Sequence, residues 1–373
     1  MIERIELSNF KIHSCLDLPL GGLTVLTGQN GMGKSSLLQA LLLLRQSCNR
    51  LSVVQGINLK GDLIDLGSAN DIECQSSDDG VLGIGLWLSG GGELTFKFSY
   101  DVEPHDTFLP LVSPANNSED FQQCALFTND FQYISAYRFG PLKGYERDTN
   151  VVQYQRQISK ENGRCEYAIH FLAHFGKRVH CLPEMLLNGT NDDDLLESQV
   201  QKWLQLVSPR VFINIEQVGA DYKLNYKFSR DGQPMTSLMP AINVGYGITY
   251  VLPILIALLS ARPGSLILIE NPEAHIHPRA QAELMRLVMR AVKAGVQIVV
   301  ETHSDHIMNG ALVSIAGDET CQDMVKAYYF ERDEATHTSV PRRLEIMKDG
   351  RVMNPPEGFF DQIDIDMRTL MGF

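Results

Sequence analysis

The stretch Gly28–Ser36, which reads GQNGMGKSS, constrains the fold of this chain more than any other feature. It fits the phosphate-binding loop pattern G-x-x-x-x-G-K-[S/T]. The apolar and β-branched run Leu23–Thr27 before it predicts a buried strand, and the Leu- and Ala-rich segment Ser36–Gln46 after it predicts a helix. A chance glycine-rich turn would lack this context. Strand, loop and helix in this order predict a nucleoside triphosphate site.

The residue types of the loop suit a polyphosphate. Glycines let backbone N–H groups turn inward on an anion, and the helix N-terminus adds its dipole. Lys34 is expected to reach the β- and γ-phosphates, and Ser35 is expected to ligate Mg²⁺. The expected cofactors are therefore ATP and Mg²⁺, and the expected binding residues are Gly28, Gln29, Asn30, Gly31, Met32, Gly33, Lys34, Ser35 and Ser36.

A second apolar run, Leu266–Glu270, ends in a carboxylate. Such a strand can lie near the strand of the phosphate loop and present an acid at its C-terminal edge, where open α/β sheets bind ligands. Glu270 is therefore the expected Mg²⁺-binding and catalytic carboxylate, acting on the metal through water. The alternative is a solvent-facing glutamate that ends a strand.

A third buried strand, Val296–Val300, is followed by Glu301-Thr302-His303-Ser304. His303 at this strand end is predicted to contact the γ-phosphate. A lone histidine is more often structural, but two nucleotide motifs in the same chain favour the functional interpretation.

These motifs resemble those of the ABC-type ATPase heads. The resemblance is seen in three segments: E-N-P-E-A-H-I-H-P (270–278), E-T-H-S (301–304) and N-F-K (9–11) before the phosphate loop. That group includes SMC-like DNA-repair ATPases and the OLD (overcoming lysogenization defect) proteins. The resemblance implies an α/β fold, namely a P-loop ATPase head whose mixed sheet carries a β-rich N-terminal lobe and a helical insertion. Residues 350–361 resemble the short tail of a bacterial ATPase family of unknown function, and ATPases of that kind occur in antiphage defence.

The resemblance also implies that the site is completed by a second subunit. ABC-type heads do this with a signature loop of Ser and Gly before a helix, and Asn243–Tyr250 occupies the corresponding place. Gly245 and Gly247 are expected to allow backbone approach to the partner's γ-phosphate. Asn243 stands where the family has Ser, and an amide still donates a hydrogen bond. The alternative is a helix N-cap with flexible glycines.

The chain departs from the family after Glu270. ABC-type heads place a catalytic glutamate there, but this chain has Asn271, which can orient water and cannot accept its proton. Either Glu273 supplies the base or hydrolysis is slow. Arg138, in the segment Tyr137–Pro141, is either a phosphate contact or an ordinary surface arginine.

The bulk composition sets limits on partners and location. The 373 residues exceed what one core usually supports, and the contents of 44% apolar and 21% charged residues are those of a globular protein. A net charge of −13 argues against a broad phosphate-backbone footprint, although a local basic strip would still allow nucleic-acid binding. The seven cysteines lie far apart, which is typical of reduced thiols in a cytosol. Because the start is strand-like and the longest apolar run is Val251–Leu259, we expect a cytoplasmic protein without signal peptide or membrane contact.

The expected organisation has four parts. Residues 1–149 form the N-terminal part of the ATPase domain, 150–210 a helical insertion, 211–340 the C-terminal part, and 341–373 a tail. Within the insertion, His170 and His174 have the i, i+4 spacing of metal ligands. Since no adjacent Glu or Cys completes such a site, we interpret them as a helix-surface pair.

The combined prediction is an ABC-like ATPase that binds and slowly hydrolyses ATP at the interface of a homodimer or higher oligomer. Its expected role is that of a regulatory or sensor subunit in antiphage defence, with the insertion as partner surface. Its effector, for which a nuclease is one candidate, would lie on another chain because no nuclease motif is evident here. The alternative is a DNA-binding maintenance or repair ATPase that acts as a nucleotide-gated clamp.

Overall fold

The computed structural model describes residues 1–48, 54–76, 80–113, 116–187, 193–356, 359 and 362–371, with only the backbone given for 362–365. Its central element is a seven-stranded sheet of order β16-β15-β14-β3-β13-β12-β8. The strands from β14 to β8 are parallel, and β15 and β16 add antiparallel pairs at one side. Their bounds are β3 Leu23–Gly28, β8 Phe131–Ile134, β12 Leu266–Glu270, β13 Gln297–Glu301, β14 Val325–Arg332, β15 Ser339–Ile346 and β16 Val352–Met353.

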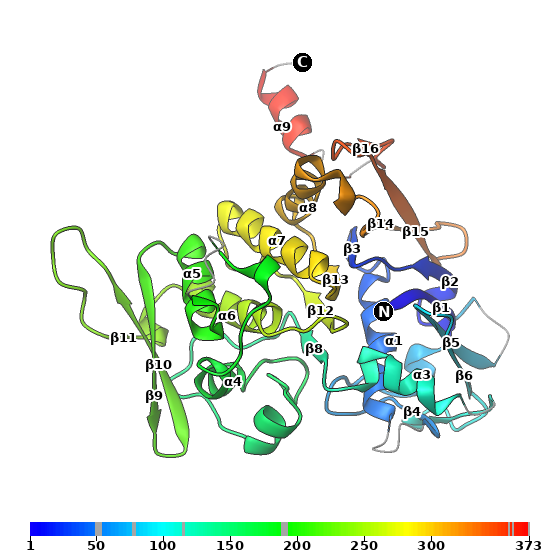
Figure 1. The fold of residues 1–373 in the computed structure, drawn as a ribbon. Coiled ribbons are helices and arrows are strands. Elements are labelled where there is room, and N and C mark those ends of the chain that lie inside the picture. Colours follow the sequence, from blue (N-terminus) through cyan, green and yellow to red (C-terminus); the bar gives the residue numbers. More distant parts are fainter. Residues whose placement is uncertain are drawn as a thin grey trace.

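One face of this sheet is covered by helix α1 (Lys34–Ser47) and a second, four-stranded sheet of order β2-β1-β5-β6. The leucines of α1 are buried between the two sheets, so a single core joins them. This part is the β-rich lobe seen in blue and cyan in Figure 1. Its elements are β1 Ile2–Phe10, β2 His13–Pro19, β4 Gly56–Asn58, α2 Ala69–Ile72, β5 Val81–Leu88, β6 Glu93–Ser99, β7 Phe108–Pro110 and α3 Ser118–Gln123.

The other face carries the remaining large core. Helix α6 is apolar along nearly its whole length and is buried between the sheet and its neighbours, whereas α7 is amphipathic and buries one stripe. The helices are α4 Ala168–Phe175, α5 Leu196–Val207, α6 Tyr246–Leu259, α7 Pro278–Lys293 and α8 Asp305–Gly317, and α9 Gln362–Met371 follows the last strand (Figure 1).

A separate antiparallel hairpin, β9 (Val211–Val218) and β10 (Asp221–Phe228), lies beside α4 and α5 at the edge of the molecule (Figure 1). The short strand β11 (Met239–Pro240) pairs with β10, which leaves β9 as the outer strand. Gly219 has a positive φ of 64°, which suits the two-residue turn between β9 and β10.

The mixed sheet and the N-terminal lobe confirm the fold class expected from the sequence. One interpretation is wrong: His170 is buried, not part of a helix surface. Its ring stacks on Tyr222 with centroids 5.4 Å apart, and its Nδ1 accepts from the backbone N–H of Asp148. Across the described ranges, no helix combines the length and the apolar character that a membrane span requires.

Candidate functional site

The phosphate loop opens into a cavity of about 990 Å³ at the C-terminal edge of the central sheet. This volume lies in the range of small-molecule sites. The cavity brings together side chains from the ends of β3, β12 and β13, as expected for parallel strands that share an edge. Among its lining residues are Asn30, Gly31, Met32, Gly33, Lys34, Ser35, Ser36, Glu270, Asn271, Glu301 and His303.

The loop backbone has the conformation that its glycines allow. Gly28, Gly31 and Gly33 all have positive φ values, of 130°, 76° and 92°. A Cβ at Gly33 would also come within 2.8 Å of His13 Nε2, and that ring nitrogen lies 3.0 Å from the Gly33 carbonyl oxygen. The loop is therefore packed on the β-rich lobe and held in shape before any ligand binds.

Lys34 folds back onto its own loop. Its Nζ donates to the carbonyl oxygens of Gly28, at 2.9 Å, and Gln29, at 2.6 Å. Burial lowers the pKa of this ammonium, and the nearby charge of Glu301 opposes the shift. A polyphosphate is a stronger acceptor than these carbonyls, so Lys34 is positioned to exchange them for a ligand.

Ser35 makes a contact that the sequence did not suggest. Its hydroxyl donates to Oε1 of Glu301 at 2.7 Å, across the edge between α1 and β13. Glu301 is only 5% exposed, and its Oε2 has no hydrogen-bond partner among the described residues. Burial and the neighbouring charge of Glu270 raise the pKa of Glu301 to about 7, against the opposing effect of the Ser35 hydrogen bond.

Glu270 lines the same cavity but turns to the other side. Its Oε1 accepts from the Tyr133 hydroxyl at 2.9 Å, and its Oε2 accepts from the Ala136 N–H at 3.1 Å. Burial raises its pKa, and these two hydrogen bonds oppose the shift. A metal-binding role for Glu270 stays a prediction.

Glu273 and His303 are linked to each other. The Glu273 carboxylate accepts from the Thr302 hydroxyl at 2.8 Å and from the His303 N–H at 2.9 Å. The His303 ring is hydrogen-bonded to the Gly28 backbone, and burial and Lys34 lower its pKa. Glu273 thus fixes the segment that carries His303 into the cavity, and a catalytic role for either residue stays a prediction.

Arg138 is buried, so it is not an ordinary surface residue, and it does not line the phosphate-loop cavity. It is 3% exposed, and its guanidinium donates to the carbonyl oxygens of Ser135, Tyr250, Glu270 and Asn271. The ring of Tyr250 stacks below it at 4.1 Å. This cation holds the end of β12 against α6. Both sequence-based interpretations missed this role, because no local pattern shows where its acceptors lie.

The segment from Asn243 to Gly247 does not line this cavity. Asn243 and Gly245 are exposed, and nothing lies within 4 Å of a Cβ at Gly245. Gly247 differs, because a Cβ there would lie 2.3 Å from the His275 carbonyl oxygen. The small size of Gly247 therefore serves close packing within this chain, whereas Gly245 presents open backbone at the start of α6.

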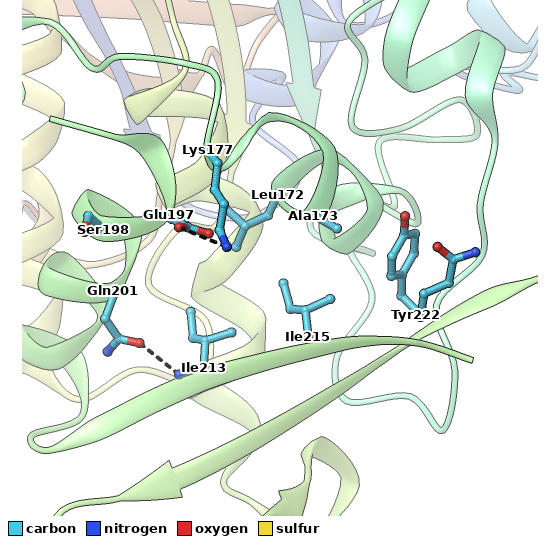
Figure 2. Close-up of a pocket in the computed structure, with 10 residues that line it drawn as sticks. Leu172, Ala173, Lys177, Glu197, Ser198, Gln201, Ile213, Ile215 and Tyr222 are labelled. Atoms are coloured by element: carbon cyan, nitrogen blue, oxygen red, sulfur yellow. Dashed lines mark hydrogen bonds and ion pairs between the residues drawn. The ribbon is translucent and has the colours of Figure 1, made fainter. Parts of the chain in front are cut away.

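A second cavity, of about 600 Å³, lies far from these residues between the hairpin and helices α4 and α5. Figure 2 shows Ile213 and Ile215 of β9 pointing toward Leu172, with the Lys177–Glu197 ion pair across the opening. We call this the hairpin groove. Its other lining residues are Ala173, Ser198, Gln201, Gln217 and Tyr222.

The residues of the first cavity fit a nucleotide with its metal. Ser35 and the carboxylates supply the oxygen ligands that Mg²⁺ prefers, and the buried, unpaired Oε2 of Glu301 is an acceptor that a hydrated cation would satisfy. Among the described residues no cluster of three or more His, Cys, Asp or Glu forms a separate metal site.

Comparisons with known proteins agree with this geometry. The model of a family described as "AAA domain, putative AbiEii toxin, Type IV TA system" matches residues 23–309, and that of a family of unknown function (DUF3696) matches residues 322–370. An OLD nuclease of Thermus scotoductus is 23% identical over 376 residues, covering 93% of this chain and 67% of that protein.

Solved structures show the same fold. The SMC head bound to the C-terminal winged-helix domain of ScpA has a TM-score of 0.55 at 13% identity, over 92% of this chain and 98% of that one. The SMC head of Pyrococcus furiosus with an extended coiled coil has a TM-score of 0.51 at 14% identity, over all of this chain and 98% of that one. These solved structures confirm the expected fold, and the family match and the OLD nuclease confirm the resemblance that the sequence motifs indicated.

Proposed function

We propose a role for this chain that builds on its family. The chain belongs to the AAA domain family matched by residues 23–309 and is an ATP-hydrolysing enzyme of the OLD and SMC-like type. It binds Mg²⁺·ATP in the phosphate-loop cavity, hydrolyses it slowly between two copies of the chain, and regulates an effector on another chain in antiphage defence. The observation that carries the nucleotide site is the convergence of Lys34, Ser35, His303 and two carboxylates on one cavity.

Slow hydrolysis follows from the groups around the expected water. Asn271 lines the cavity and has no basic atom that could take a proton from water. Glu273 is engaged by Thr302 and His303, and it is absent from the cavity lining. A site that binds tightly and turns over slowly suits a switch, in which the ATP-bound state lasts long enough to act on a partner.

The exposed start of α6 supports completion of the site by a second copy. Gly245 caps this helix and leaves open backbone, and Tyr246 beside it is 57% exposed. A helix N-terminus with free N–H groups is an anion site, and here its first residues do not line the cavity of their own chain. A second copy would bring its own ATP to this surface.

The hairpin groove is the surface we assign to the effector, and its occupant is an extended peptide segment of that protein. Gln201 closes the first part of the outer edge of β9, because it accepts from the Ile213 N–H and donates to the Val211 carbonyl oxygen. In an antiparallel pair, the backbone N–H and C=O groups of every second residue point to the same edge of the strand. Those of Ile215 therefore point to the outer edge of β9, as those of Ile213 do, and no described residue bonds to them. An added strand would satisfy these groups and bury its apolar side chains on Ile213 and Ile215.

The assembly experiment tests the regulatory proposal. Light scattering of the purified protein should show a shift to a dimer or higher oligomer when ATP and Mg²⁺ are added. Monomers under both conditions would contradict joint ATP binding by two copies. Salt-sensitive binding to DNA with an ATP-dependent affinity would instead favour a nucleotide-gated clamp.

The effector surface is tested by co-expression with the product of a neighbouring gene. Ile215→Lys should abolish co-purification, since it places a charge in the apolar groove. Val218→Lys is the matched control, because Val218 lies on the same strand, is 47% exposed and does not line the groove. Equal co-purification with both variants would remove the groove from the proposal.

A further inference from the structure

The hydroxyl of Ser35 is already oriented for a cation. It has one proton, which it donates to Glu301 Oε1 at 2.7 Å. A hydroxyl whose proton is engaged keeps both lone pairs for other partners. Ser35 lines the cavity, so a lone pair is available there to a hard cation that prefers oxygen ligands. Glu301 is thus the group that fixes the orientation of the expected metal ligand.

The second oxygen of Glu301 has no partner. Oε2 is buried, and no described residue donates to it. A buried acceptor without a hydrogen bond is costly, and such atoms are rare in folded proteins. The carboxylate lies at the cavity wall between Ser35 and the strand of Glu270, so a small rotation of the side chain would bring Oε2 to a water bound to a cation beside Ser35. The structure therefore leaves an unmet acceptor on the carboxylate that is bonded to Ser35, the expected metal ligand.

The neighbouring carboxylate lacks this freedom. Both oxygens of Glu270 already accept, from Tyr133 and Ala136, at the end of β8. To reach a cation beside Ser35, Glu270 would have to give up at least one of these bonds. Glu301 would give up none, because its bond to Ser35 is compatible with a metal on the same hydroxyl.

We propose that Glu301 is the carboxylate that holds the Mg²⁺ of bound ATP in place, by orienting Ser35 and by accepting from water on the metal. The inference rests on the proposed ATP site and adds a residue of β13 to it.

The test measures metal binding separately from turnover. Mn²⁺ replaces Mg²⁺ as a paramagnetic probe, and its affinity for the complex of protein and non-hydrolysable ATP analogue is measured by electron paramagnetic resonance. Glu301→Gln keeps an acceptor for Ser35 and removes the charge, so the affinity for Mn²⁺ should fall by roughly ten- to a hundredfold. Binding of the analogue in excess EDTA should stay unchanged, because the metal is then absent.

Three further variants make the result specific. Glu301→Asp keeps the charge on a shorter side chain and should recover part of the Mn²⁺ affinity. Glu345→Gln removes an exposed glutamate from β15 and should behave as the wild type. Glu270→Gln should lose less than Glu301→Gln. Thermal unfolding of each variant shows that the fold is kept.

The outcomes separate this inference from the ATP proposal. If the wild type binds no analogue with or without metal, the proposed nucleotide site itself is wrong. If the wild type binds Mn²⁺ with the analogue and Glu301→Gln binds it equally well, only the role of Glu301 is wrong. If Glu270→Gln loses more affinity for Mn²⁺ than Glu301→Gln, then Glu270 is the carboxylate that holds the metal.

Discussion

Glu270 and Glu301 end adjacent parallel strands in register, and their carboxylates bond to different neighbours. Glu270 bonds to Tyr133 and Ala136 on the side of β8, whereas Glu301 bonds to Ser35 on the side of the phosphate loop. The two carboxylates at this edge of the sheet therefore have different hydrogen-bond partners. Glu270 is tied to the loop that contains Arg138, and Glu301 is tied to the nucleotide loop.

Replacing Lys34 should abolish nucleotide binding. Lys34→Ala removes the charge expected on the β- and γ-phosphates, so ATP affinity should fall by roughly a hundredfold or more. Isothermal titration calorimetry measures this directly. Lys348→Ala, at a side chain that is 71% exposed, is the control and should bind like the wild type. Unchanged ATP affinity in Lys34→Ala would contradict the assignment of the loop.

Two variants of Glu273 distinguish a base from a positioning residue. If Glu273 takes the proton from water, Glu273→Gln should keep ATP binding, trap the ATP-bound assembly and lose on the order of a hundredfold in turnover. If it acts by holding Thr302 and His303, Gln retains an acceptor and Glu273→Ala should lose far more than Glu273→Gln. Phosphate release in steady state measures both, and full activity in both variants would remove Glu273 from the site.

Asn271→Glu provides the complementary measurement. It places a carboxylate where related ATPases have their base, so phosphate release should be faster than in the wild type. The backbone φ of Asn271 is 45°, a conformation that asparagine adopts more readily than glutamate. Thermal unfolding should accompany the assay, because a folded variant that is no faster would show that this position does not limit the rate.

The sequence predicted those parts of the fold that have a local cause. Strand β12 and the loop Gly28–Ser36 follow from apolar runs and glycines that lie next to each other in the chain. Glu301 was missed because its importance depends on Ser35, which is 266 positions away. Arg138 was misjudged for the same reason, since its acceptors at Tyr250, Glu270 and Asn271 are more than a hundred positions distant.

Two glycines near the start of α6 should respond differently to substitution. Gly247→Ala brings a methyl group to 2.3 Å from the His275 carbonyl oxygen, so the free energy of unfolding should fall by about 1–3 kcal/mol. Gly245→Asp meets open space and should leave the monomer as stable as the wild type. Its added negative charge should nevertheless weaken ATP-dependent assembly. Urea unfolding and light scattering provide the two readouts, and intact assembly in Gly245→Asp would contradict contact with the partner's phosphates.

Removing Arg138 should destabilise the fold. Arg138→Met keeps much of the side-chain volume on Tyr250 but removes the guanidinium from four carbonyl oxygens, of which those of Ser135 and Asn271 keep a backbone N–H donor, and this should cost about 2–4 kcal/mol in the free energy of unfolding. Urea unfolding measures the loss. Arg351→Ala, at a side chain that is 81% exposed, should stay within about 0.5 kcal/mol of the wild type. Equal stability of both variants would contradict the role of Arg138 in holding the end of β12.

The buried ring of His170 should make stability depend on pH. Burial, and secondarily the charge of Arg147, lower the pKa of His170 from 6.5 to about 4, so the folded state disfavours its proton. An unfolded chain binds that proton below pH 6.5, and the contribution of the neutral ring is therefore complete above this pH and is lost as the pH falls toward 4. A shift of this size corresponds to about 3 kcal/mol, which we expect to be lost from the free energy of unfolding in this window.

His170→Gln isolates that contribution, because glutamine does not titrate and its amide can still accept from the Asp148 N–H. Urea unfolding of both proteins at a series of pH values gives the difference between them, in which the titration of all other groups largely cancels. The difference in the free energy of unfolding between the wild type and the variant should become smaller as the pH falls from 6.5 to 4. This range is set by the lowered pKa of the His170 ring. A difference that is constant across this range would show that His170 keeps an ordinary pKa, and that its stacking on Tyr222 admits the protonated ring.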